Sequence, residues 1–274
     1  MSEAPLLPHE ALPSRKAKRF WLFVGANMLF LAGATRVLEL DPLVLFTDFH
    51  YIVDLLGEML PPAFELFYQD ARVWLLLAET LAMATIGTAL GFALAFVLAF
   101  LAARNTTPFP LLRGPCRVLL GAMRAAPDFA IMLVIVVAVG FGPFAGSLAL
   151  VIGSAGMFGK LFADAVEQIE AATVDSLAVV GASRLQTIRY AVLPQVLPSF
   201  VANGLYLFEF NTASAVALGT FGAGGLGFAV RVAEQTLNYP DVMAYIIVWV
   251  GLMTVVEKLS DRIRTRLFAA DEKG

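Results

Sequence analysis

The most constraining feature of this chain is a series of apolar runs, each long enough to cross a lipid bilayer. The runs cover approximately residues 20–38, 73–102, 125–141, 144–162, 200–221 and 242–259. A helix needs about 20 predominantly apolar residues to span the hydrocarbon core. The composition agrees, because 59% of the 274 residues are hydrophobic and only 15% are charged, with a mean hydropathy of +0.79. We therefore predict an all-α polytopic membrane protein with about six transmembrane helices.

The distribution of basic residues predicts how these helices are oriented. Basic clusters precede the first run and follow the second and the last, whereas residues 41–70 contain no Lys or Arg. Basic residues stay on the cytoplasmic side of a membrane, so both termini should be cytoplasmic in a bacterial inner membrane. We expect a cytoplasmic tail (1–19), a first transmembrane helix (20–40), a periplasmic or interfacial segment (41–70), a core transmembrane domain (71–260) and a second cytoplasmic tail (261–274). The first run is too long for a signal peptide and lacks a small-x-small cleavage site.

Several classes of chemistry have no basis in this sequence. Cys116 is the single cysteine, which excludes an intrachain disulfide and a multi-cysteine metal site. The motifs H-E-x-x-H, G-x-S-x-G and G-x-x-x-x-G-K-[S/T] do not occur. The net charge of −3 gives no case for nucleic acid. We therefore expect no catalytic site, no metal and no cofactor bound by this chain.

One polar stretch, residues 164–199, stands out between two apolar runs. Its first half has helical spacing of apolar residues. Gly181 can supply a left-handed C-terminal turn, and Ser183 can cap a second short helix. The pattern favours a helix–turn–helix against the membrane surface, suited to a partner's groove. An ordinary amphipathic loop explains the same pattern equally well.

Polar residues inside the apolar runs are candidates for a solute pathway or a gate. Glu79, Glu209 and Asn211 lie within predicted spans, where an ionisable group should face a cavity, a partner or a structural hydrogen bond. Structural anchoring between helices is an equally good explanation for Glu209. Arg124 and Asp128 are four residues apart and can pair across the Pro127 kink, with a packing or gating role.

Glycines mark two further features. Gly222, Gly224 and Gly225 begin a G-x-G-x-x-G sequence, but it follows a membrane span rather than a strand, so a dinucleotide site is not indicated. Such a run instead allows a sharp turn in the pathway or gate, and its N–H groups can receive an anion. Gly153, Gly156 and Gly159 form a ladder that is typical of helix packing.

The polar stretch resembles the coupling motif of binding-protein-dependent ABC importer permeases. That motif reads E-A-A, three residues, G, nine residues, I, one residue, L-P; here Gly181 is followed by nine residues, then Ala191, Val192, Leu193 and Pro194. The literal Glu170-Ala171-Ala172 lies too far upstream, so the motif's first three positions fall on Asp175, Ser176 and Leu177. The resemblance implies that the ATPase-coupling residues are Asp175, Ser176, Leu177, Gly181, Ala182, Ser183, Leu193 and Pro194.

Several segments from about residue 75 to the C-terminus are similar to the phosphonate-importer permease family. They include Glu79-Thr80, Leu101-Ala-Ala-Arg104-Asn105, Arg124-Ala-Ala-Pro127-Asp128, Gly140-Phe-Gly-Pro-Phe-Ala-Gly146, Gly159-Lys160, Phe208-Glu209 and Gly222-Ala-Gly-Gly225. The resemblance implies a type I ABC importer permease fold with a cytoplasmic coupling helix. It also implies a homodimer with two ATPase subunits, which use ATP and Mg²⁺, and a periplasmic solute-binding protein. Phosphonate, phosphite or a related phosphorus oxyanion would be the solute.

Two other hypotheses remain open at this point. A permease for another small solute, such as methionine or phosphate, would share the coupling motif. An ion-coupled secondary transporter would use intramembrane charges such as Glu79 and Glu209, but the sequence lacks the internal repeat that often marks such carriers.

Overall fold

The computed structural model describes residues 14–38, 44–107, 109–170, 172, 176–177, 179 and 181–271. All regular structure in these ranges is helical, which confirms the predicted all-α class. The chain divides into two compact units, residues 1–57 and 58–274, which are described separately.

The first unit holds the N-terminal span and a short helical segment. α1 (Ser14–Val37) contains a membrane-length apolar stretch, Ala17–Val37, of which no part is buried. The predicted first transmembrane helix is therefore present, with its start earlier than expected. α2 (Val44–Thr47) and α3 (Phe49–Glu58) follow, and α3 buries none of its residues. The apolar side chains of this unit are consequently exposed on helices that a membrane environment would cover.

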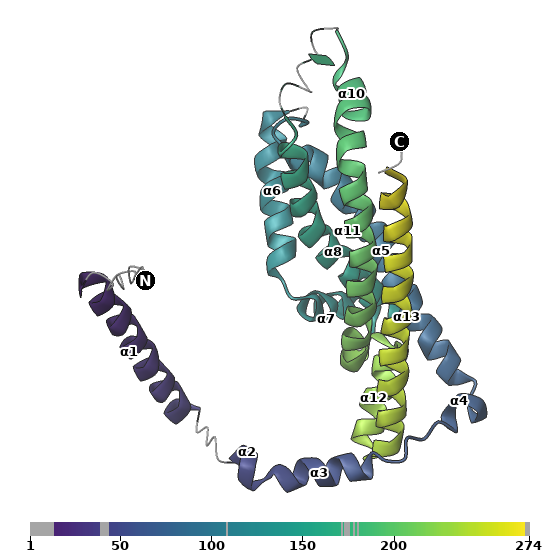
Figure 1. Ribbon diagram of the computed structural model, residues 1–274. Helices are drawn as coiled ribbons and strands as arrows, with labels where there is room; N and C mark the ends of the chain where they lie inside the picture. Colours follow the sequence, from purple (N-terminus) through teal and green to yellow (C-terminus); the bar gives the residue numbers. More distant parts are fainter. Residues whose placement is uncertain are drawn as a thin grey trace, which may run out of the picture. The chain divides into compact units, whose positions relative to one another are not determined.

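The second unit is a bundle of long helices joined by short ones (Figure 1). In order, it comprises α4 (Leu66–Gln69), α5 (Arg72–Ala102), α6 (Pro110–Ala125), α7 (Asp128–Val139), α8 (Pro143–Glu167), α10 (Arg184–Thr187), η1 (Ile188–Val192), α11 (Leu193–Leu218), η2 (Gly219–Ala223), α12 (Gly225–Gln235) and α13 (Tyr239–Asp271). α5, α8 and α11 contact one another, and α13 packs along α11. Across the described residues, 5 helices can span a membrane, or 6 if α6 and α7 form one broken span. This agrees with the predicted number.

The third predicted span, residues 125–141, differs from the observed structure. The arginine-rich segment before it, which no predicted span included, forms α6, and α7 meets α6 at an angle of 96°. Proline causes the break, because Pro127 lacks an N–H and disfavours a helical conformation at the preceding residue. Ala126 is accordingly extended, with φ −83° and ψ 127°.

Glycines bring the helices of the bundle into close contact. A Cβ added to Gly91 in α5 would lie 2.6 Å from the Cβ of Ser154 in α8, and one added to Gly87 would meet Leu150 at the same distance. On α8, a Cβ on Gly153 would collide with Asp128, and one on Gly159 with Leu120. The predicted packing role of the glycine ladder in α8 is thus confirmed.

Candidate functional site

The turn at Gly181 has the geometry that the sequence predicts. Gly181 has φ +81°, in the left-handed region that favours glycine. The N–H of Ala182 donates to the carbonyl of Leu177 at 3.0 Å, spanning five residues. This is the bond by which a left-handed glycine closes a helix end.

The predicted cap at Ser183 is also confirmed. The Ser183 hydroxyl accepts a hydrogen bond from the N–H of Gln186 at 3.4 Å, and the N–H of Ser183 donates to Gln186 Oε1 at 2.7 Å. This reciprocal pair is a capping box at the start of α10. It fixes the point where the chain leaves the turn and enters the next helix.

The second short helix is not separate from the following span, contrary to the boundary expected near residue 200. α10, η1 and α11 form one continuous helical segment from Arg184, which runs on into η2 and bends there at Gly222. Pro194 cannot donate to the carbonyl of Tyr190, and the helix adopts a π-turn here in which the N–H of Leu193 donates to the carbonyl of Ile188. Leu193 and Pro194 therefore lie inside a continuous rod that begins at the Ser183 cap.

Of the coupling residues suggested by the motif, Leu193 and Pro194 lie inside this segment, and Gly181, Ala182 and Ser183 lie directly before it. Ser176 is exposed and Leu177 is half-buried, while Asp175 lies outside the described residues. Arg184, which sequence reasoning missed, donates from Nη1 to the carbonyl of Thr107 at 2.8 Å. This bond ties the start of α10 to the loop that follows α5.

A second missed feature is a polar cluster around Glu167, at the end of α8. Glu167 Oε1 accepts from the N–H of Arg104 at 2.7 Å and pairs with Arg117 Nη2 at 2.7 Å and Arg113 Nη2 at 3.5 Å. Asn105 Nδ2 donates to the carbonyl of Val166 at 2.7 Å. The cluster joins the ends of α5 and α8 to α6, a few residues before the segment with the coupling motif. The i, i+4 spacing of Arg113 and Arg117 was the available sequence signal.

Glu79 and the glycine run, both proposed for the pathway or gate, are brought together. Gly222, Gly224 and Gly225 have φ values of +102°, +84° and +66°, which produce the expected sharp turn. Glu79 Oε2 accepts from the N–H of Gly225 at 2.9 Å, and Thr80 Oγ1 accepts from the N–H of Leu226 at 2.9 Å. Side chains of α5 therefore cap the first turn of α12, occupying N–H groups that the sequence left available for an anion.

Glu209 and Asn211 lie at different helix contacts. Glu209 Oε1 on α11 is 3.8 Å from Arg264 Nη2 on α13, and the Glu209 side chain is 18% exposed. The amide of Asn211, which is 1% exposed, bonds to the Ser154 hydroxyl at 3.0 Å and donates to Thr88 Oγ1 at 3.0 Å. Asn211 thus connects α11 to both α5 and α8, which is an anchoring geometry.

Arg124 and Asp128 flank the break between α6 and α7. They do not pair in the structure, since no ion pair joins them in the described ranges. Both instead line a cavity of about 300 Å³ with Met123, Pro127, Gly153, Met157 and Phe210.

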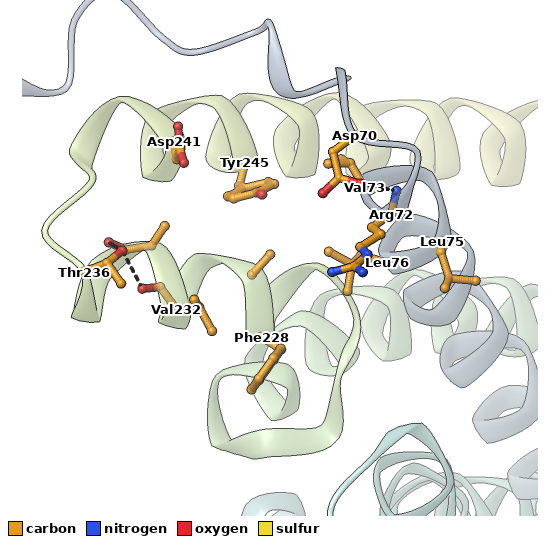
Figure 2. A pocket seen from close by; sticks show the side chains of 12 residues that line it. Asp70, Arg72, Val73, Leu75, Leu76, Phe228, Val232, Thr236, Asp241 and Tyr245 are labelled. Carbon is orange, nitrogen blue, oxygen red and sulfur yellow. Dashed lines mark hydrogen bonds between the residues drawn. The ribbon is translucent and has the colours of Figure 1, made fainter. Parts of the chain in front are cut away.

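A second cavity, of about 400 Å³, lies where α5, α12 and α13 approach one another (Figure 2). Asp70 and Arg72 line it at the start of α5, and Asp241 and Tyr245 line it on α13. Asp70 Oδ1 accepts from the N–H of Arg72 at 2.8 Å, which satisfies the first N–H group of α5. Sequence reasoning did not single out these residues.

The fold and the polar segment between α8 and α11 define a polytopic permease. Residues 91–269 match the family described as binding-protein-dependent transport system inner membrane component. The chain belongs to this family and is the inner-membrane permease component of an ABC importer.

Two curated relatives and a solved structure are similar to this chain. A phosphite transport system permease protein of Stutzerimonas stutzeri is 39% identical over 226 residues, which cover 82% of this chain and 81% of the relative. A phosphate-import permease protein of Mycolicibacterium smegmatis is 39% identical over 235 residues, which cover 86% of this chain and 44% of that protein. A chain from the inward-facing MetNI methionine ABC transporter superposes with a TM-score of 0.62 at 21% identity, covering 72% of this chain and 98% of that one. This last likeness supports the type I importer permease fold.

Proposed function

We propose that this permease imports a phosphonate, phosphite or phosphate ion, delivered by a periplasmic solute-binding protein. The names of the relatives support this choice of solute, since both similar permeases serve phosphorus oxyanions. Two copies of the chain form the pathway, and two ATPase subunits bind below it. ATP and Mg²⁺ belong to these subunits, and the chain itself needs no cofactor.

The observation that carries the mechanism is the local geometry at Gly181 and Ser183. The turn and the capping box present a short, well-defined projection at the start of a helix that continues into α11. A partner that pushes on this projection moves α11 directly, because no flexible loop intervenes. Rigid-body transmission of this kind suits alternating access.

Two contacts extend the effect of that push to the rest of the bundle. The bond from Arg184 to the Thr107 carbonyl links α10 to the end of α5. The cluster at Glu167 links the ends of α5 and α8 to α6. Movement of the coupling segment is therefore transmitted to the broken span formed by α6 and α7.

The orientation follows from the same arrangement. ATPase subunits are cytoplasmic, so the turn at Gly181 and the Glu167 cluster face the cytoplasm. The basic residues after α5 and near the end of α13 lie on that side, in agreement with the positive-inside pattern. Both termini are then cytoplasmic, and residues 41–70 lie at the periplasmic surface.

The solute is tested by uptake into proteoliposomes that contain the complete complex and its binding protein. We expect ATP-dependent uptake of one or more of labelled methylphosphonate, phosphite and phosphate, and none of methionine or sulfate. Uptake of methionine with no phosphorus oxyanion transported would contradict the proposed solute. The permease role would stand in that case.

A further inference from the structure

We propose that the cavity at the α6–α7 break is a subsite for the transported ion, in which Arg124 holds the negative charge and Asp128 accepts a hydrogen bond from the ion's remaining P–OH group. The inference rests on the proposed function, because it names the residues that contact the solute.

The depth of the cavity is the first argument. A Cβ on Gly156 would lie 2.5 Å from the backbone nitrogen of Arg124, and one on Gly153 would meet the Asp128 carboxylate. Both glycines are near the middle of α8, which runs from Pro143 to Glu167. At 1.5 Å per residue, the break lies roughly 15–20 Å from either end of that span. Arg124 and Asp128 are therefore near the bilayer midplane.

Among the described residues, the charged side chains of Arg124 and Asp128 have no structural partner. Neither side chain makes a hydrogen bond or ion pair with another residue in the described ranges, although Asp128 is only four residues from Arg124. An arginine at the centre of a membrane costs about 2.5–3.5 kcal/mol on insertion scales. Glu79, by contrast, accepts from the N–H of Gly225, and Glu209 has Arg264 at 3.8 Å although its Oε1 makes no hydrogen bond. The cavity at the break thus holds two charged side chains, Arg124 and Asp128, that no other described residue neutralises.

The third argument is chemical complementarity. A guanidinium binds tetrahedral oxyanions through forked N–H groups. A carboxylate beside it disfavours an ion without a dissociable proton, such as sulfate, because two negative charges would meet. A phosphorus oxyanion keeps one P–OH group over part of the neutral range, and that hydroxyl can donate to Asp128. The pair of residues therefore suits a protonated phosphorus oxyanion.

The walls of the cavity suit a small solute with an organic substituent. Met123, Met157 and Phe210 are apolar, and two of them are flexible thioethers that adapt to different shapes. The volume of the cavity, about 300 Å³, is within the range of small-molecule sites. The non-helical residues of the break, Ala126 and Pro127, also line the cavity, which is where irregular backbone is tolerated at this depth.

The test uses the complete complex in proteoliposomes, with the binding protein and labelled methylphosphonate, phosphite and phosphate. Uptake and binding-protein-stimulated ATP hydrolysis are measured for Arg124→Gln, Arg124→Lys and Asp128→Ala. Arg231→Gln is the matched control, because Arg231 is exposed on α12 and pairs only with Glu234 among the described residues. Loss of a charged hydrogen bond costs about 1.5–3 kcal/mol, so Arg124→Gln should lower uptake by about 10-fold or more.

Support requires that stimulated ATP hydrolysis persists in Arg124→Gln and Asp128→Ala while uptake falls. Arg124→Lys should retain more uptake than Arg124→Gln, because the charge is preserved without the forked geometry. Uptake in Arg124→Gln within about 2-fold of the wild type would overturn the subsite and leave the proposed function intact. Loss of assembly in the Arg124 variants would assign the residue to packing and also overturn the subsite. A wild-type complex that transports none of the three ions would overturn both proposals.

Discussion

Gly156 in α8 offers the sharpest test of how the broken span is held in place. A Cβ at this position would lie 2.5 Å from the nitrogen of Arg124 and 2.7 Å from both the carbonyl carbon and the Cβ of Met123. Ordinary contact begins at 3.4 Å, so Gly156→Ala requires a displacement of about 0.9 Å. Two of the three opposing atoms belong to the backbone of α6, and a change of side-chain rotamer cannot relieve the clash.

The cost of this change can be estimated from other overpacked cores. Insertion of an extra methyl group into a close-packed contact costs about 1–3 kcal/mol. For a protein of this size, each kcal/mol corresponds to a shift in Tm of about 2–4 °C. We therefore expect Gly156→Ala to lower the Tm of the purified chain in detergent by several degrees, measured by thermal unfolding.

Gly114→Ala is the matched control. Gly114 lies in α6, and an added Cβ would meet no atom within 4 Å. Alanine is favoured over glycine in a helix by about 1 kcal/mol, so this variant should be at least as stable as the wild type. Equal Tm values for Gly156→Ala and Gly114→Ala would refute the close contact between α6 and α8.

Three further predictions address the turn, the cap and the ion pair. Gly181→Val should uncouple ATP hydrolysis from transport while the spans stay folded, because a β-branched residue is strained at φ +81°. Gly181→Asn should retain coupling, because asparagine tolerates this backbone region. Normal coupling in Gly181→Val would contradict the mechanism. Thr80→Val should destabilise the chain by about 1–3 kcal/mol in thermal unfolding, because the N–H of Leu226 loses its acceptor, whereas Thr80→Ser should not. Glu209→Ala should lower the free energy of unfolding by about 1 kcal/mol, since Arg264 loses a half-buried partner but keeps Asp261. An unchanged Tm together with reduced uptake would instead place Glu209 in the pathway.

Features set by neighbouring residues were predictable from the sequence. The left-handed turn at Gly181 and the cap at Ser183 depend on side chains within a few positions, so local pattern was sufficient. The apolar runs likewise predicted the spans, because length and hydropathy are properties of each segment alone.

Features that join distant segments were not predictable in the same way. The bond from Glu79 to Gly225 spans 146 residues, and the bond from the N–H of Arg104 to Glu167 spans 63. Nothing local in the sequence pairs these groups, and their pairing depends on how the helices pack. The bend at Pro127 was predictable only in part. Proline indicated a kink, but the angle of 96° between α6 and α7 reflects how both helices pack on α8.

The central claim is that the chain transports its solute only as part of an ATP-driven complex. The most direct measurement compares uptake of labelled methylphosphonate, phosphite and phosphate into proteoliposomes that contain either the complete complex or this chain alone. We expect uptake that requires ATP, the ATPase subunits and the binding protein together, and none by the isolated chain under an ion gradient. Uptake by the isolated chain without ATP would contradict it.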